Sequence, residues 1–262
     1  MIVTETGFTG TAVSLSYPRI GAYPIAGTVT PSTEATGFEA VNAQDGQTWT
    51  FWKPTAVPAT WDLAFSSAAV SYVGIAAHNI GSTGGTIAVF EWTGAAFVSI
   101  KTHTPTDDSP IMFLLTRRTA QTQFRIRITN AIPTIGVIYI GDVLEFPSKA
   151  EFTGSLPFAE ATQSTYSDTL SDGGHVLERF EIRKAAPVSM EVRNLSETWV
   201  ATNLVPLAVQ MRDNPVFIAD RPGDYPTSVA FGLSRNPVMA ERTLAMAGAS
   251  RSVTFDINGF VA

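Results

Sequence analysis

The feature that most constrains this chain is a series of short apolar runs, separated by turn-forming residues, between about residue 36 and residue 147. Residues 124–128 alternate apolar and polar side chains, as expected of a half-buried strand. Gly and Ser at 81–85 and Thr-Gly at 93–94 provide turns between such runs. Short strands at this spacing predict an all-β sandwich. The expected strands are 61–65, 70–77, 86–92, 97–100, 111–115, 124–128, 135–140 and 143–146.

The chain of 262 residues is long enough for two domains. Residues 36–147 are expected to form the first domain and residues 148–262 the second, because the strand pattern is interrupted near Pro147. Residues 1–35, rich in Thr, Gly and Pro, predict an N-terminal arm with the first strands; an arm that extends to a neighbouring subunit is the alternative. In the second domain, strands are expected at 176–184, 187–193, 216–219, 229–233, 243–247 and 252–257, the first two as a pair.

The second domain contains one predicted helix, over residues 196–212. Ser196 is a good N-cap, and Glu197 places negative charge in the first turn, where the helix dipole favours it. From Trp199 onward, apolar residues three or four positions apart give the helix one buried face. Pro206 predicts either a kink or a later start of the helix. The second domain is therefore expected to be β-rich with a single helix.

The composition limits the classes of partner. Charged residues make up 15% of the chain, well below the usual quarter, whereas hydrophobic residues make up 45%. The polar surface must then be built from Ser, Thr, Asn and Gln. Such a surface suits a protein packed against neighbours, and it equally suits an isolated β domain with Thr-rich faces. A net charge of −6 without a basic stripe argues against a dedicated nucleic-acid binder.

The absence of cysteine excludes disulfide frameworks, zinc–thiolate sites and cysteine nucleophiles, and it predicts folding in a reducing cytoplasm. The N-terminus lacks the basic and apolar regions of a signal peptide. No apolar run approaches the ~20 residues that a membrane helix needs. We therefore expect a soluble protein, made in a cytoplasm, without a membrane partner.

Several segments of the first domain resemble discoidin, or coagulation-factor type C, domains, which have a galactose-binding-like fold. Residues 39–46 end in an Asp-Gly turn, and residues 48–52 follow with two tryptophans. A Trp-Asp-Leu strand begins at Trp61, while 124–128 and 135–146 resemble the last two strands. The resemblance implies a discoidin-like jelly roll, a β-sandwich, for the first domain.

Many relatives with this jelly roll bind sugars through aromatic residues in loops at one end. By that resemblance, Trp92 at a hairpin tip is the leading candidate for carbohydrate binding, followed by Trp52, His78 and Asn79. Aromatic faces stack on sugar rings, and Asn or His side chains donate to hydroxyl groups. Core packing is the alternative for the tryptophans, since Trp49 and Trp52 can fill the end of the sandwich.

Calcium binding also occurs among the relatives, through carbonyl and Asp oxygens. Asp45, Asp107 and Asp108 are the only candidates, and the last two are expected to cap a turn instead. We predict no metal site and no cofactor.

The chain as a whole resembles minor or distal tail proteins of bacteriophages, which join a small β module to a tube-like split barrel with one helix. The segment 214–226 is similar to the stretch that follows the helix in such proteins, although Phe217 stands there without an aromatic cluster. The resemblance implies a structural component of the virion tail, made in the host cytoplasm. Its expected partners are other tail proteins, its own copies in a ring, and host glycans. A carbohydrate-binding module without an assembly role is the alternative.

No catalytic site is predicted. His78, His103 and His175 lie far apart and in no metal-binding pattern, and neither a Gly-x-Ser-x-Gly elbow nor a phosphate-binding loop occurs. Carboxylates are numerous enough for glycoside hydrolysis, so a glycan depolymerase stands as a further alternative. We expect a protein that is not an enzyme.

Overall fold

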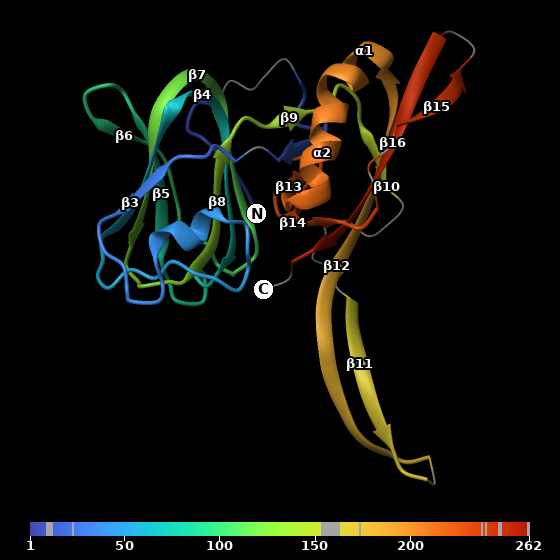
Figure 1. Ribbon diagram of the computed structural model, residues 1–262, viewed down its shortest axis with the longest axis horizontal. Coiled ribbons are helices and arrows are strands. Elements are labelled where there is room, and N and C mark those ends of the chain that lie inside the picture. The colour runs from blue at the N-terminus through green and yellow to red at the C-terminus, as the bar shows by residue number, and fades with distance from the viewer. Residues whose placement is uncertain are drawn as a thin grey trace.

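In the computed structural model, two β-rich units lie side by side and a long hairpin projects from the second (Figure 1). Strands dominate both units, and one interrupted helix lies against the second. The predicted mostly β class with a single helix is therefore confirmed. The structure describes residues 1–8, 13–22, 24–152, 163–172, 174–236, 238, 240–245 and 248–260.

The first unit is a seven-stranded sheet folded into a two-layer sandwich. One layer has the strand order β3-β4-β7-β5-β6, and the other has the order β8-β4-β7-β1. The long strands β4 and β7 therefore run through both layers. The elements are β1 (Ile2–Thr4), β3 (Thr28–Pro31), the 3-10 helix η1 (Ala40–Gln44), β4 (Ala59–His78), β5 (Thr86–Trp92), β6 (Phe97–His103), β7 (Ile111–Thr129) and β8 (Ile135–Gly141).

The two long strands bend where they pass between the layers. The pairing of β4 with β7 shifts register repeatedly between Ala64 and Tyr72. The sequence predicted two short strands within β4, at 61–65 and 70–77, and likewise two within β7. This prediction of a break is wrong, because bulges bend a strand and change its twist without ending its ladder.

The sandwich core lies between the two layers. Phe124, Ile126 and Ile128 are fully buried, as their alternation predicted, and they belong to the same core cluster as Trp61 and Phe113. Burying each of these large side chains contributes about 1.5–3 kcal/mol to folding.

The second unit is a nine-stranded sheet with the order β10-β12-β16-β14-β13-β2-β9, in which β11 also pairs with β12 and β15 with β16. The strands are β2 (Arg19–Gly21), β9 (Leu144–Glu145), β10 (Ala150–Phe152), β11 (Gln163–Leu170), β12 (Val176–Ser196), β13 (Val216–Ala219), β14 (Val229–Ser234), β15 (Ala240–Ala245) and β16 (Gly248–Gly259). The end of the strand expected at 243–247 lies outside the described residues.

The strand pair predicted at 176–193 is wrong: these residues belong to one strand, β12. β12 pairs with β11 as far as Ala185 and with β10 from Met190 onward. Pro187, which lacks an N–H group, lies between these two partners, and within the described part of the chain it pairs only with β16. A proline is tolerated in a strand at a place where its missing donor is not needed by a second neighbour.

The residues predicted as an N-terminal arm are shared between the two units. β1 and β3 join the sandwich, whereas β2 lies in the second sheet between β13 and β9. The segment therefore ties the units together. The sheets interleave along the sequence, and a single boundary at residue 147 does not separate them.

The helix begins at α1 (Glu197–Trp199), continues through a π-helical turn (Val200–Leu204) and ends in α2 (Val205–Asp213). The Ser196 hydroxyl accepts a hydrogen bond from the Trp199 N–H at 3.2 Å, so the predicted cap is confirmed. The π turn directly precedes Pro206, whose ring would clash with a carbonyl of a regular α-helix. Among the described residues, no helix has the length and apolarity to cross a bilayer.

Alternate residues of β13 join the second unit to the sandwich. Val216 and Ile218 pack toward the helix, whereas Phe217 packs against Tyr139 of the sandwich and Phe231 of β14. The ring centroid of Phe217 lies 5.7 Å from that of Tyr139 and 4.6 Å from that of Phe231. The units therefore meet through a buried aromatic cluster.

Candidate functional site

Trp52, the second sugar-binding candidate, is an interior residue. Its side chain is fully buried, and its indole N–H donates to the Thr33 carbonyl at 3.2 Å. Its backbone pairs with Ile135 in both directions. The core-packing alternative therefore applies to Trp52, and its prediction as a sugar platform is wrong, because no face of the ring reaches solvent.

The side chains of His78 and Asn79 form hydrogen bonds with neighbouring loops. The His78 ring is buried; its Nε2 lies 3.0 Å from the Ser109 carbonyl oxygen, and its Nδ1 accepts from the Ile80 N–H at 3.2 Å. Burial lowers the pKa of His78 to about 4, so the neutral ring persists through the physiological range. The Asn79 Oδ1 accepts from the Thr134 N–H at 2.7 Å. Both side chains therefore hold loops together. Burial rules out His78 as a sugar donor, whereas the role of the half-buried Asn79 stays a prediction.

The aspartates considered for calcium cap turns. Asp107 accepts from the Ser109 N–H at 2.9 Å, and Asp108 accepts from the Ser82 N–H at 2.9 Å. Asp45 accepts from the Gln47 N–H at 2.8 Å. Among the described residues, no three carboxylate or imidazole groups gather in a way that could hold a metal ion.

Trp92, the leading candidate, lies at the end of β5 and is half-buried. Its ring lies opposite Phe97 of β6, with 5.0 Å between the ring centroids. The guanidinium of Arg125 covers the other aromatic of this pair, 3.9 Å from the centroid of Phe97. Trp92 thus remains accessible, and its role in carbohydrate binding stays a prediction.

Trp49 lies at the surface of the sandwich. Core packing at the end of the sandwich does not apply to it, because 72% of the residue is exposed. The loop that carries it requires glycine at Gly46, which has a φ of +76° and lies so close to Tyr139 that a Cβ would clash with the hydroxyl group. The polar neighbours of Trp49 in Thr48-Trp49-Thr50 were the one local signal of exposure.

Trp49 lines a cleft of about 520 Å³ between the two units. The sandwich contributes the loop around Asp45 and Gln47. The second unit contributes residues 213–215 at the end of the helix, 231–233 of β14 and 258–260 at the end of β16. The cleft therefore lies beside the buried aromatic cluster through which the two units meet.

The cleft combines an apolar floor with polar groups of both hydrogen-bonding types. Phe231 and Leu233 supply apolar surface, while Asn214 and Asn258 supply amides that both donate and accept. Its only charged lining groups among the described residues are the carboxylates of Asp45 and Asp213. Such a site suits an uncharged, hydroxyl-rich molecule with one apolar face.

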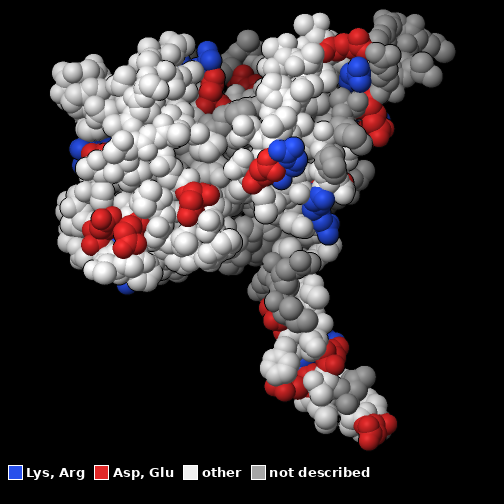
Figure 2. All heavy atoms as spheres, viewed as in Figure 1, with Lys and Arg blue, Asp and Glu red and all other residues white. Residues whose placement is uncertain are grey.

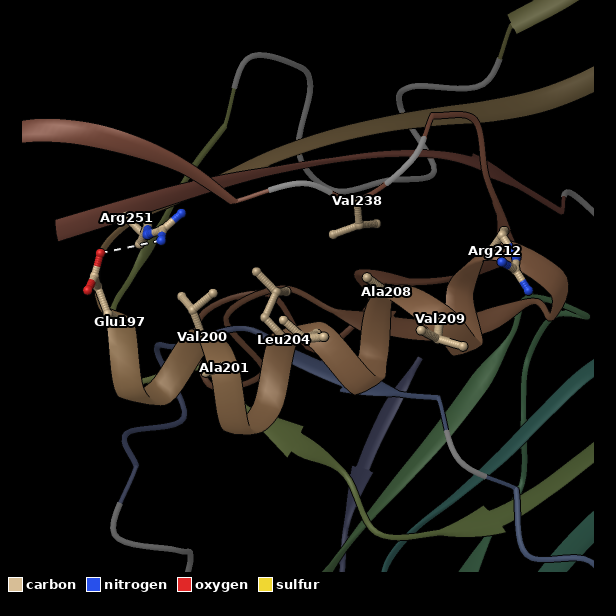
Figure 3. A pocket seen from close by; sticks show the side chains of 10 residues that line it. Glu197, Val200, Ala201, Leu204, Ala208, Val209, Arg212, Val238 and Arg251 are labelled. Carbon is tan, nitrogen blue, oxygen red and sulfur yellow. Dashed lines mark hydrogen bonds and ion pairs between the residues drawn. The ribbon is translucent and has the colours of Figure 1, made fainter. Parts of the chain in front are cut away.

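A second hollow, of about 580 Å³, runs along the outer side of the helix (Figure 3). Its lining is aliphatic, with Val205 and Val209 largely exposed. At one end Arg251 reaches Glu197 at 3.3 Å, and Arg212 lies at the other. Without an aromatic platform, this groove suits aliphatic side chains of another protein better than a sugar.

No protein-family model matches the chain. No curated protein matches its sequence.

Several solved structures with similarity to the chain are named as carbohydrate-binding modules. Chitosan-binding module 1 of a chitosanase/glucanase from Paenibacillus sp. IK-5 is 23% identical, with a TM-score of 0.38, over 45% of this chain and 97% of that one. The family 32 module of NanJ from C. perfringens, in complex with galactose, is 14% identical, with a TM-score of 0.41, over 48% of this chain and 99% of that one. A pectin-binding module is 16% identical, with a TM-score of 0.39, over 46% and 92%. At these scores the likeness carries no conclusion about a ligand of this chain.

Proposed function

We propose that this protein binds a glycan in the cleft beside Trp49. The observation that carries the proposal is a tryptophan with 72% of its surface in water, at the rim of a cleft that both units build. Removing apolar surface from water stabilises by about 25 cal/mol per Å². A partner that covers the exposed indole ring would therefore gain binding free energy from its burial.

The chemistry of the cleft favours a neutral saccharide. The C–H face of a pyranose ring can lie on Trp49, and its hydroxyl groups need both donors and acceptors, which Asn214 and Asn258 provide. The carboxylate of Asp45 disfavours acidic sugars, because like charges repel, whereas the carboxylate of Asp213 is paired with Arg212 at 2.7 Å. The proposed ligand class is therefore neutral hexose or N-acetylhexosamine oligosaccharides.

The variant Trp49→Ala is expected to weaken glycan binding by about 30-fold or more, since an aromatic anchor of a binding site typically contributes about 2 kcal/mol or more. The thermal unfolding midpoint should stay unchanged, because the side chain is mostly exposed. A glycan array identifies a neutral oligosaccharide ligand, and isothermal titration calorimetry with that ligand compares the variant with the unaltered protein.

Tyr166→Ala is the control, because it removes an exposed aromatic side chain from the projecting hairpin, outside both proposed sugar-binding surfaces. It should leave affinity for the neutral ligand unchanged. Full affinity of Trp49→Ala, or an array without any neutral ligand, contradicts the proposal.

A second candidate function is structural: we propose that the chain assembles with its own copies as a component of a bacteriophage tail. The observation that favours assembly is the hairpin of β11 and β12, which extends away from both units (Figure 1). A two-stranded ribbon is at best marginally stable alone, and its free edges invite pairing with another chain. Leu177 and Phe180 on this ribbon are largely exposed.

The surface composition suits assembly as well. Figure 2 shows a face on which charged side chains are few and scattered over both units. The aliphatic groove beside the helix offers a place where apolar side chains of a second copy could be covered. Contact between copies would therefore desolvate few charges.

The double variant Leu177→Ser and Phe180→Ser should remain monomeric under conditions in which the unaltered protein forms oligomers, because its hairpin loses the apolar contacts. Size-exclusion chromatography with light scattering measures the masses. Val41→Ser, at another exposed valine, is the control and should still assemble. An unaltered protein that stays monomeric at high concentration, or a double variant that assembles normally, argues against this role.

A further inference from the structure

The two outer faces of the sandwich differ in what covers them. The outer face of the β8-β4-β7-β1 layer is apolar, and its Tyr72, Met112 and Tyr139 are buried with residues of the second unit. The layer β3-β4-β7-β5-β6 turns its outer face away from the second unit (Figure 1). This uncovered surface, here called the open face, is the large sandwich face available to a partner.

The strand register places arginines and aromatics together on the open face. Phe124, Ile126 and Ile128 of β7 point into the core, so Arg125 and Arg127 point outward. On β5, Phe90 pairs with Arg125 and Ala88 pairs with Arg127; on β4, Asp62 pairs with Arg125 and Thr60 with Arg127. Directly opposite residues of antiparallel strands share a face.

The guanidinium groups lie over aromatic rings. Arg127 lies 4.6 Å from the ring centroid of Phe90, and Arg125 lies 3.9 Å from that of Phe97. Phe97 in turn contacts Trp92, the next outward residue of β5 after Phe90. The result is a continuous patch of rings and guanidinium groups on the open face.

The charge of this patch is not balanced. Arg125 is neutralised by Asp62, through two hydrogen bonds of 2.7 and 2.6 Å. Arg127 is exposed, and the described residues give it no carboxylate partner. One cation therefore remains available on the patch for a negatively charged ligand.

We propose that the open face binds an extended acidic polysaccharide, with a uronate carboxylate on Arg127 and a sugar ring on Trp92. By strand rise, Trp92 lies about 13 Å along β5 from Ala88, the partner of Arg127. A monosaccharide cannot bridge this separation, whereas an extended chain can. Arginine suits the carboxylate because its planar fork donates two hydrogen bonds to it.

A nucleic acid fits the same surface less well. Its affinity comes mainly from neutralising several phosphates. The open face offers a single unpaired cation among the described residues, with Asp62 close by, and the chain as a whole carries −6. An acidic polysaccharide with spaced charges is therefore the partner that the face favours.

The test compares polygalacturonate with neutral dextran in affinity gel electrophoresis and titration calorimetry. Arg127→Gln keeps a polar side chain at this position but removes the charge and the guanidinium that lies over Phe90. It is expected to weaken binding of polygalacturonate by about tenfold or more, as for loss of a charged hydrogen bond. Trp92→Ala should weaken it as well, and added salt should weaken binding to the unaltered protein.

Arg212→Gln is the control, because it makes the same change of charge at an exposed site on the helix, where 71% of the side chain is in water. It should bind polygalacturonate as the unaltered protein does. Equal binding by Arg127→Gln and the unaltered protein, or equal losses in Arg127→Gln and Arg212→Gln, overturns the proposal. So does binding of a single-stranded oligonucleotide in place of polygalacturonate.

This site is independent of the proposed cleft site. Trp49→Ala should retain polygalacturonate binding while it loses the neutral ligand, and Arg127→Gln should show the reverse. The two variants therefore test the two proposals separately, and one proposal can fail while the other holds.

Discussion

Phe217→Ala is expected to lower the free energy of unfolding by about 3–5 kcal/mol, the largest effect of any single change considered. The ring is fully buried at the junction of the two units, between Tyr139 and Phe231. On the sandwich side it lies against Gly74, where a Cβ would come within 2.6 Å of the ring. Truncation therefore leaves a cavity that neither sheet can close, because each is held by its own hydrogen-bond ladder.

Urea denaturation, followed by far-UV circular dichroism, measures this change. Phe38→Ala is the matched control, because that ring is 38% exposed and its loss should cost less than about 1 kcal/mol. Comparable losses in the two variants would show that the aromatic junction does not stabilise the protein. The cleft beside Trp49 depends on the same junction, since both units supply its walls.

Arg118→Met is expected to lower the free energy of unfolding by about 2–4 kcal/mol at neutral pH, because it leaves two carboxylates without their cation. Arg118 bonds to Glu5 at 2.9 Å, to Glu91, and to the carbonyl of Thr116 at 2.7 Å. The Glu5 side chain is only 7% exposed, so water cannot replace the lost partner fully. This network joins Glu5, which follows β1, to β5 and β7.

Adding Glu5→Gln and Glu91→Gln to Arg118→Met should restore most of the stability, since no buried charge then lacks a partner. Urea denaturation of the unaltered protein and both variants at neutral pH tests this. A loss that the triple variant does not relieve would mean that packing of the Arg118 stem matters instead.

Local patterns were sufficient for part of this fold. The alternation of 124–128 depends only on strand geometry, and its apolar residues are buried as predicted. Ser196 caps the helix because a hydroxyl beside free N–H groups satisfies one of them wherever the helix packs. The mostly β class was predicted in the same way, because many short segments each showed the pattern of a strand.

Long-range contacts decided what local patterns could not. Bends in β4 and β7 keep their ladders, so no turn residue marks where each strand passes between the layers. β12 continues through Pro187, and the strand beside β12 changes there from β11 to β10. The residues of β12 alone do not show where this change of partner occurs.

Two tryptophans three residues apart show most clearly how local sequence and long-range contacts differ in what they determine. Trp52 is buried because its backbone pairs with Ile135 and its ring N–H meets the Thr33 carbonyl. Trp49 faces water beside a wall that the second unit supplies. Sequence alone determined the β class, the helix cap and the strand alternation, because these depend on neighbours along the chain. Only the tertiary structure decided which tryptophan lines the cleft and which sandwich face stays open, because burial depends on surfaces brought together from distant segments.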